Sequence, residues 1–521
     1  MAANRAGFSW PGKPGKADKE DVSHKLREVV GGPAMPRNVG GCLAALLLFG
    51  GLGLALAQET APLPQSAPAD PADKPLPIDL ASALQLANAR AIDVAVAAER
   101  IRLAAAQYDR AHVAWLPTIQ LGIDYFRHDG RIQDVQGNII DTSKSSFMLG
   151  AAPNAVFALS DAIFAPLAAR QVVQAREAEL QASTNDTALS VAEAYFNVQQ
   201  ARGELAGAID AVRRSEELVL RTTELARDLA PPVEATRARA ELARRKQAVQ
   251  AARERWRVAS AELTRILRLD PAAVVEPVEP PNLQVTLVAL DKPVDDLIAT
   301  GLTNRPELTS QQALVRAALQ QLRQERVRPL VPSILVRGAA TNPAGTLAGG
   351  YFGGGINDEV SRFGARGDYD VQVLWQLENL GFGNSARVKE RRAEHQLAVL
   401  ESLRLQDRVA AEVKQASDQV QSAAARVKEA ESGLKDAVES VNQNFEGLKQ
   451  TKRVGNLLVL VIRPQEVAAA VQALALAYGD YYGAIGDFNR AEFRLYRAMG
   501  QPAQAILDDS LVLGASHRSE K

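Results

Sequence analysis

Cysteine is almost absent from this chain of 521 residues, and its one copy, Cys42, lies at the start of an apolar run. That run, Gly41–Ala57, follows Arg37 and ends in a small-x-small pattern at residues 55–57, which is typical of a cleaved secretory signal peptide. Cleavage would make Gln58 the first mature residue. The mature chain would then hold no cysteine, which excludes disulfides and thiolate metal sites.

Two further expectations concern this leader, residues 1–57. Its first part, 1–34, is long and polar for the start of a signal peptide, so we predict that translation begins at Met35. A membrane anchor is the alternative for the apolar run, but the run is short for that role. Cys42 begins the run, whereas a lipid-acceptor cysteine would follow it, so we expect no lipid anchor.

Aromatic residues make up only 5% of the chain, although apolar residues reach 47% and many of these are alanine. Such a composition favours long helices in close lateral contact over a bulky globular core. The net charge of -1 gives no reason to expect a nucleic-acid partner. No second apolar run is long enough to cross a bilayer as a helix, so a secreted chain of this kind is either soluble or crosses a membrane as strands.

Residues with the chemistry for catalysis or metal binding are also scarce. The mature chain has four histidines, none at ligand spacing from another, and we expect all of them at the surface: His112, His128, His395 and His517. The triglycine at 353–355 does not open a helix after a strand, so it is no phosphate-binding loop. We therefore expect no enzyme, no cofactor and no metal site.

The main feature that the chain does contain is a duplicated unit. Each copy is predicted to run through a helix, a pair of strands, a very long helix, a turn and a return helix. Leu116-Pro117 before the first strand pair recurs as Val331-Pro332 in the second copy. The predicted segments are a Pro/Ala-rich mobile linker at 58–77, a first repeat at 78–268, an equatorial connection at 269–294, a second repeat at 295–500 and a tail at 501–521.

Very long helices are predicted over about 160–229 and 384–453, because no proline interrupts either segment after its first turns. The second carries apolar residues at 4,3 spacing from Val409 to Val441, which indicates a coiled coil. Each would measure about 105 Å, and each return helix, 233–268 or 465–499, about 55 Å. The helices before the strands, 80–114 and 295–328, match the return helices in length, so two short helices placed end to end would equal one long helix.

Strict alternation of apolar and polar residues marks the strands. In 118–127, Ile119, Leu121, Ile123 and Tyr125 share an apolar face, and Gln120, Gly122 and Asp124 share a polar one. The partner strand, within the hairpin 118–159, is interrupted by Pro153. In the second repeat, strands are predicted near 333–340 and 369–378, with Asp370 and Gln372 on the polar face. The segments 128–145 and 341–367 are expected to be loops.

In order and spacing, these features resemble the TolC-like outer-membrane efflux protein family over about 78–500. The motifs that carry the resemblance are Leu116-Pro117, the strand exit at 164–170 with its counterpart at 382–387, and the return helix at 463–482. The resemblance implies a mainly α fold with a small antiparallel β part. In a homotrimer, long coiled-coil helices would form an α-barrel, and four strands per protomer would complete a 12-stranded transmembrane β-barrel. Four strands alone cannot close a barrel, and eight would leave it filled by side chains.

The resemblance also implies a function and a set of partners. The chain would be the passive outer-membrane duct of a tripartite efflux or type I secretion system. It would contact outer-membrane lipid, extend into the periplasm, and work with a periplasmic adaptor protein and an inner-membrane pump. The alternative is a soluble periplasmic coiled-coil scaffold, in which the apolar strand faces of 118–127 and 370–377 meet water or a partner protein.

The site residues follow from these roles. The predicted positions are Gln120, Asp124, Asp370 and Gln372 lining the pore, Ala230, Pro231, Val454, Gly455 and Asn456 docking the adaptor, and Trp115, Tyr125 and Trp375 in an interfacial aromatic girdle. The two aspartates either bias the pore toward cations or only solvate a wide lumen. The aromatic residues either meet lipid or pack a junction between strands and helices. The first tip lacks the glycine usual in the family, which puts adaptor docking there in doubt.

Overall fold

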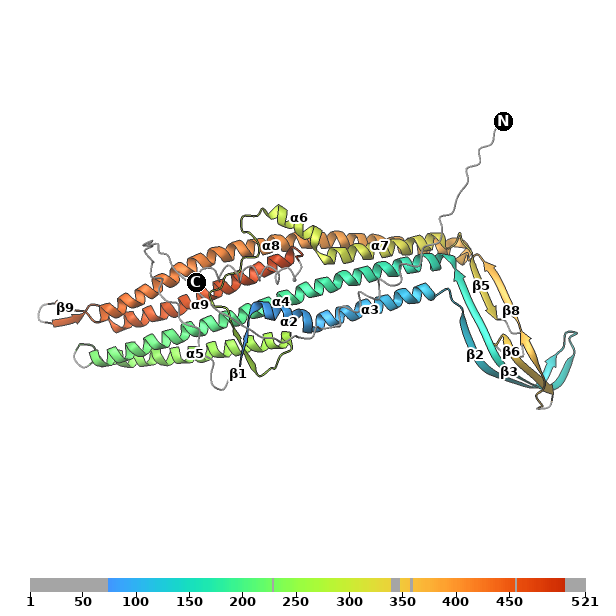
Figure 1. Cartoon of the computed structure of the whole chain (residues 1–521), viewed down its shortest axis with the longest axis horizontal. Helices are drawn as coiled ribbons and strands as arrows, with labels where there is room; N and C mark the ends of the chain where they lie inside the picture. The colour runs from blue at the N-terminus through green and yellow to red at the C-terminus, as the bar shows by residue number, and fades with distance from the viewer. Residues whose placement is uncertain (1–73, 227–228, 339–346, 357–358, 455–456, 502–521) are drawn as a thin grey trace, which may run out of the picture. The chain divides into compact units, whose positions relative to one another are not determined.

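A computed structural model describes residues 74–226, 229–338, 347–356, 359–454 and 457–501, all within one compact unit, Ala61–Lys521. The predictions for the leader, for Gly455 and Asn456, and for nearly all of the tail lie outside the described residues. Within them, long helices run side by side and lead at one end into an antiparallel sheet (Figure 1). The predicted fold class, mainly α with a small antiparallel β part, is confirmed.

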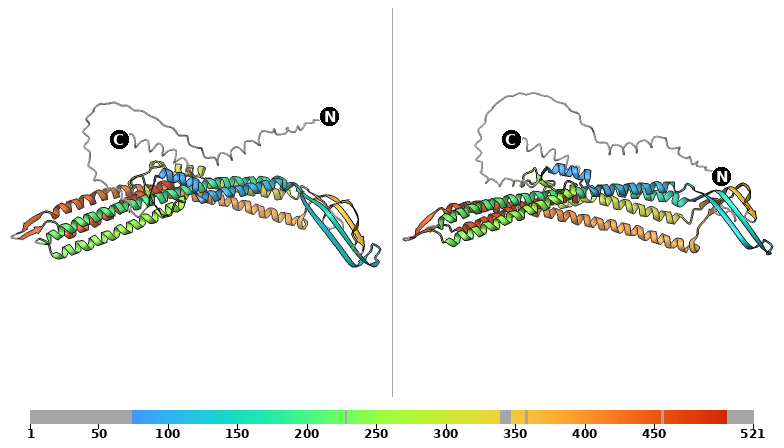
Figure 2. Two further views of the ribbon diagram at one scale, coloured as in Figure 1. Left: turned by 60° about the horizontal axis from the view of Figure 1, so that its bottom comes forward. Right: turned by 90° about the horizontal axis from the view of Figure 1, so that it is seen from below.

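The helices follow the order that the sequence predicts. They are α2 (Leu80–Arg90), α3 (Ile92–Val113), α4 (Leu159–Leu225), α5 (Pro232–Leu267), α6 (Val294–Asn304), α7 (Pro306–Val327), α8 (Phe382–Leu448) and α9 (Pro464–Ala498). The two long helices, α4 and α8, have 67 residues each, or roughly 100 Å. Next to the sheet, the neighbours lie in the order α3, α4, α7, α8; farther away the order is α5, α4, α9, α8 (Figure 2).

Each helix expected before a strand pair is in fact two helices. The breaks fall at Ala91 and Arg305, which have extended backbone at the equivalent position of each repeat. Arg305 precedes Pro306, and the proline ring disfavours helical backbone in the residue before it. The predictions of single helices over 80–114 and 295–328 were therefore wrong at these two positions.

The last residues of the predicted linker pair with residues near the start of the predicted equatorial connection. Strand β1 (Lys74–Ile78) runs parallel to β4 (Ala273–Pro277), and Leu76 lies opposite Val275. Residues 74–77 are thus part of a sheet and not of a mobile linker. Tyr195 of α4 donates a hydrogen bond to the carbonyl oxygen of Ile78, which fixes β1 against the long helix.

The large sheet has six strands. They are β2 (Thr118–Gln133), β3 (Ile139–Ala158), β5 (Ser333–Gly338), β6 (Gly349–Ile356), β7 (Ser361–Gly367) and β8 (Tyr369–Leu374). One edge of β3 pairs with β2, and its other edge pairs first with β6 and then with β5. Because β7 pairs with the other edge of β6, and β8 with the other edge of β5, the sheet is four strands wide between Ser146 and Ala151 of β3.

Two predicted loops are largely strands. Most of 128–145 belongs to β2 and β3, and 341–367 includes β6 and β7. The glycine-rich segment has low strand propensity, but pairing with β3 supplies hydrogen bonds that local sequence cannot predict. Pro153 is tolerated inside β3 because it lies at the change of partner, after Ala151 paired with β6 and before Asn154 paired with β5.

Two apolar clusters hold the helices together. One lies between α8 and α9 and buries the predicted heptad seam, which is thereby confirmed at Val409, Val413, Val420, Val427 and Val441. The other joins α4, α5 and the β1–β4 pair around Trp256 and Tyr195. None of the described helices is both long and apolar enough to span a membrane.

Candidate functional site: the two sheet faces and the helix tips

The apolar face of the sheet is open to its surroundings. Ile119, Leu121, Ile123 and Tyr125 of β2 are between 57% and 79% exposed. The register places Leu149 of β3 opposite Ile123, and Tyr351 of β6 opposite Leu149. On β3 the face runs from Phe147 to Phe157, eleven residues. A tilted strand needs about 9–11 residues to cross a bilayer, so the face has the length of a transmembrane band.

The predicted girdle residues are all exposed. Trp115 lies between α3 and β2, Trp375 directly follows β8, and Tyr125 lies at the middle of β2. Each is more than half exposed in the chain. These residues are therefore not packed within this chain, and their place in an interfacial girdle stays a prediction.

The four predicted pore-lining residues share the polar face. Gln120 lies opposite Ala152, and Asn154, two residues along β3 on the same face, lies opposite Arg337. Arg337 in turn lies opposite Asp370. Because directly paired residues point the same way, this chain of pairs places Gln120 and Asp370 together, and their neighbours Asp124 and Gln372 with them.

Arg337 is a residue of this face that the sequence reasoning missed. Its guanidinium lies 3.0 Å from the Asp370 carboxylate, and Gln372 donates to the same carboxylate at 2.6 Å. This ion pair balances the charge of Asp370. Of the two aspartates expected to bias a pore toward cations, Asp370 therefore no longer supports that bias. The alternation Ile334, Val336 on the apolar face was the signal that could have placed Arg337 on the polar one.

The two helix tips differ in structure. At the first, α4 ends at Leu225 and Pro231 precedes α5, so Ala230 and Pro231 form the turn between the helices. At the second, a two-stranded hairpin of β9 (Thr451–Val454) and β10 (Leu457–Leu460) separates α8 from α9. Sequence reasoning extended the helix to Arg453 and missed this hairpin, because its strands are too short for alternation to be visible.

Comparisons with known proteins agree with this geometry. Residues 83–267 match the family model described as outer membrane efflux protein. No curated protein matches the chain. The chain is similar to the outer-membrane channel OprN, with 16% identity, a TM-score of 0.63, and coverage of 82% of this chain and 90% of that one. The resemblance to TolC-like outer-membrane efflux proteins is confirmed.

Two further structures show the same likeness to TolC-like channels. The outer membrane protein VceC from Vibrio cholerae has 15% identity and a TM-score of 0.63, and the match covers 81% of this chain and 96% of that one. The CmeC outer membrane channel of Campylobacter jejuni has 15% identity and a TM-score of 0.63, with coverage of 83% and 89%. At such identities the likeness establishes the fold alone.

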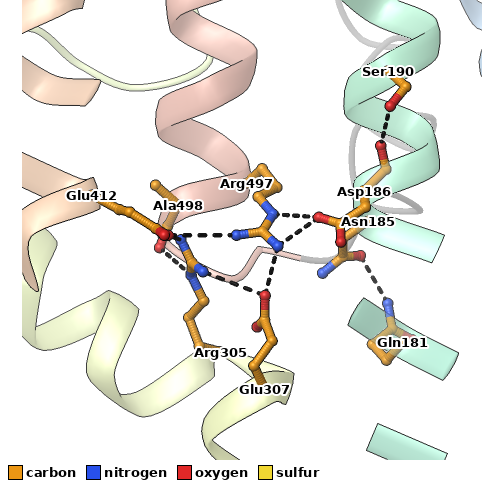
Figure 3. A network of polar contacts seen from close by, with 9 residues as sticks. All are labelled: Gln181, Asn185, Asp186, Ser190, Arg305, Glu307, Glu412, Arg497 and Ala498. Carbon is orange, nitrogen blue, oxygen red and sulfur yellow. Dashed lines mark hydrogen bonds and ion pairs between the residues drawn. The ribbon is translucent and has the colours of Figure 1, made fainter. Parts of the chain in front are cut away.

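An ionic network joins the two repeats of this TolC-like fold where α6 meets α7 (Figure 3). Arg305 is buried, and its guanidinium reaches Glu412 of α8 at 2.5 Å and the Ala498 carbonyl oxygen at the end of α9 at 2.8 Å. Arg497 of α9 contacts Glu307 of α7 and Asp186 of α4, each at 2.6 Å. The network thus fixes α7 and α9 end to end between the two long helices.

No candidate metal site accompanies these features in the part of the chain that the structure describes. There, no group of three or more His, Cys, Asp or Glu side chains is placed to hold a metal ion. The predicted site residues lie on the two faces of the sheet and at the tips of the helical part.

Proposed function

We propose that this chain is one protomer of a trimeric outer-membrane duct, a passive conduit without a catalytic site of its own. The observation that carries the proposal is a sheet with an exposed apolar face, a second face that carries the predicted pore-lining residues, and two open edges. Among the described residues, no strand pairs with the outer edge of β2 or with the outer edges of β7 and β8. Open edges of this length favour pairing with another chain.

The helical part also has two outer sides next to the sheet, one on the side of β2 and one on the side of β7 and β8. Its outer helices next to the sheet are α3 and α8. Both expose large apolar side chains, namely Ile92, Val96, Leu103 and Val113 on α3 and Leu397, Leu400 and Leu403 on α8. A head-to-tail ring would cover both sides at once, with β2 beside the next copy's β7 and β8.

Three copies would give the ring a usable lumen. Twelve strands about 4.8 Å apart and tilted by about 40° place the backbone roughly 12 Å from the barrel axis. The apolar face would then meet lipid, and Gln120, Asp124, Asp370 and Gln372 would line the interior. This assigns the chain to the outer membrane, with its helical part extending into the periplasm.

The helix tips are the proposed contact with the rest of the export machinery. A periplasmic adaptor would dock at Ala230, Pro231, Val454, Gly455 and Asn456, and an inner-membrane pump would supply the energy, in a tripartite efflux or type I secretion system. The two tips would present different surfaces to the adaptor, because one is a proline turn and the other a β-hairpin.

Solubility and pore formation test the proposal against the periplasmic scaffold. We expect the purified protein to need detergent, to migrate as a heat-modifiable trimer in gels, and to form pores in planar lipid bilayers. A protein that fractionates as a water-soluble monomer and forms no pores would refute the duct and favour the scaffold.

A further inference from the structure

A strained turn joins the outer strand β8 to the outer helix α8. Within this turn, η1 (Glu378–Gly381), Asn379 and Leu380 have φ angles of 49° and 60°, in the left-handed region. Gly381 follows with a φ of 91°, which glycine adopts readily. Left-handed backbone is unfavourable for a residue with a Cβ, and more so for leucine than for asparagine, whose short polar side chain can form local hydrogen bonds.

Polar contacts within the chain hold the turn in this conformation. The N–H of Glu378 donates to Oδ1 of the buried Asn384 at 2.8 Å, and Arg387 reaches the Glu378 carboxylate at 2.9 Å. The turn nevertheless leaves Leu380 91% exposed and Phe382, the first residue of α8, 78% exposed. The chain thus maintains an unfavourable backbone that presents two apolar side chains outward, and strain of this kind is concentrated at functional positions.

Phe382 lies on the outer side of α8. Arg391 and Ala398, two turns apart on one side of this helix, are half-buried, and Gln311 of α7 donates to the Ala398 carbonyl oxygen at 3.2 Å. At about 100° per residue, Phe382 and Leu400, each nine residues from Arg391, point to the opposite side, where both are exposed. Because α8 is the last helix in the order α3, α4, α7, α8, that side faces away from the protomer.

The opposite edge of the protomer presents an apolar surface at the same level. On α3, Ala97 and Ala104 are buried on the side that packs against α4. Val113, nine residues after Ala104, points to the other side and is exposed, as is Leu116 in the link to β2. Because α3 ends and α8 begins next to the sheet, Val113 and Phe382 lie at the same end of the two outer helices.

Resting on the proposed duct, we infer that the η1 turn is a contact between copies, which docks Leu380 and Phe382 on the α3–β2 junction of the next protomer, around Val113 and Leu116. A head-to-tail ring brings α8 of one copy beside α3 of the next. Each side then offers apolar side chains that its own chain leaves exposed. A fixed turn at this level sets the relative height of neighbouring protomers, because two packed helices can otherwise shift along each other by one turn.

Cysteine cross-linking tests this contact on the full-length protein in outer membranes. In a Cys42→Ser background, which holds no other cysteine, Phe382→Cys is combined with Val113→Cys and treated with a short bismaleimide. The two positions lie at opposite edges of the helical layer, so a cross-link joins two copies. We expect covalent trimers in denaturing gels from the double variant and none from either single variant. Phe382→Cys with Leu330→Cys, in the turn between α7 and β5, is the matched control and should stay monomeric.

Heat dissociation of the trimer tests the turn itself. Leu380→Asn keeps a residue that tolerates left-handed backbone but removes the apolar side chain, so its effect reports the contact and not the strain. We expect the dissociation midpoint to fall by about 3–6 °C. Leu330→Asn is the control, since Leu330 is 75% exposed at the same end of the helices but lies away from both edges, and it should keep the wild-type midpoint.

The outcomes separate this contact from the proposed function. A wild-type trimer that gives no cross-link between positions 113 and 382, or whose midpoint is unchanged in Leu380→Asn, would overturn the contact but leave the duct intact. Equal falls in Leu380→Asn and Leu330→Asn would show that lipid, and not the next copy, meets both turns, and would also overturn the contact. A wild-type protein that is monomeric would overturn the contact and the duct together.

Discussion

Two glycines of α4 make the close contact with α9 possible, and adding one methyl group there tests how tightly the two repeats pack. A Cβ on Gly203 would lie 2.5 Å from the Tyr482 ring, and a Cβ on Gly207 would lie 2.6 Å from Tyr478. Both tyrosines are buried, and their rings stack with centroids 6.5 Å apart. Neither ring can move aside without displacing the other.

The size of the effect follows from two opposing terms. Alanine favours a helix over glycine by about 1 kcal/mol. Overpacking a buried contact costs about 1–3 kcal/mol, and the fixed rings place Gly203→Ala toward the upper end. We therefore expect Gly203→Ala to lower the free energy of opening of α9 by about 2 kcal/mol net.

Gly433→Ala is the matched control. This glycine lies inside α8, and no neighbouring atom lies within 4 Å of its added Cβ. Only the helix preference remains, so this variant should be stabilised by about 0.5–1 kcal/mol. Hydrogen exchange of amides in α8 and α9 measures both changes. Equal effects of the two substitutions, or protection of α9 unchanged in Gly203→Ala, would refute the account of α4–α9 packing.

Three more perturbations probe other parts of the fold. Arg305→Met removes the guanidinium from Glu412 and from the Ala498 carbonyl oxygen, but Glu412 is 40% exposed and keeps Arg497 at 3.7 Å, so the unfolding free energy should fall by about 2 kcal/mol. Arg102→Met, at an exposed pair, should change it by less than about 1 kcal/mol, and equal urea midpoints for the two variants would contradict this. Ile123→Lys puts a charge on the apolar face at a cost of about 2–4 kcal/mol and should deplete heat-modifiable trimer from outer-membrane extracts. Burial raises the pKa of Glu492, whose carboxylate accepts N–H groups from Leu287 and Val288 at 3.0 and 3.1 Å. The folded state therefore holds this proton more tightly, and its contribution to stability falls as the pH rises from about 4.5 through the raised pKa. Glu492→Gln should remove that fall, and a pH profile of thermal unfolding like that of the wild type would show the reasoning to be wrong.

Part of the candidate site could be predicted from alternation alone. A strand has a period of two, so Ile119, Leu121 and Ile123 had to share one face and Gln120 and Asp124 the other, whatever the strand paired with. The neighbouring strands were not predictable in the same way. Arg337 contacts Asp370 because β5 and β8 pair in one register, which is a property of the sheet and not of either strand.

The ionic network could not be predicted for a related reason. The network joins residues that lie far apart in the sequence, namely Asp186, Arg305, Glu412 and Arg497. Three of them are ordinary charged residues on helices, and Arg305 lies at a helix break. Only the placement of α7 and α9 end to end on α8 brings them together. The motif Arg305-Pro306 is a local signal for a break in a helix. It does not predict the contacts that Arg305 makes with α8 and α9.

The sequence by itself determined the long helices, the buried heptad seam, and which face of each predicted strand is apolar, because each follows from the spacing of residues within one segment. Tertiary structure alone decided that a glycine-rich segment becomes two strands and that Pro153 falls between two partners. These features depend on contacts between segments that lie far apart in the chain. No local pattern in the sequence predicts the free energy of such contacts.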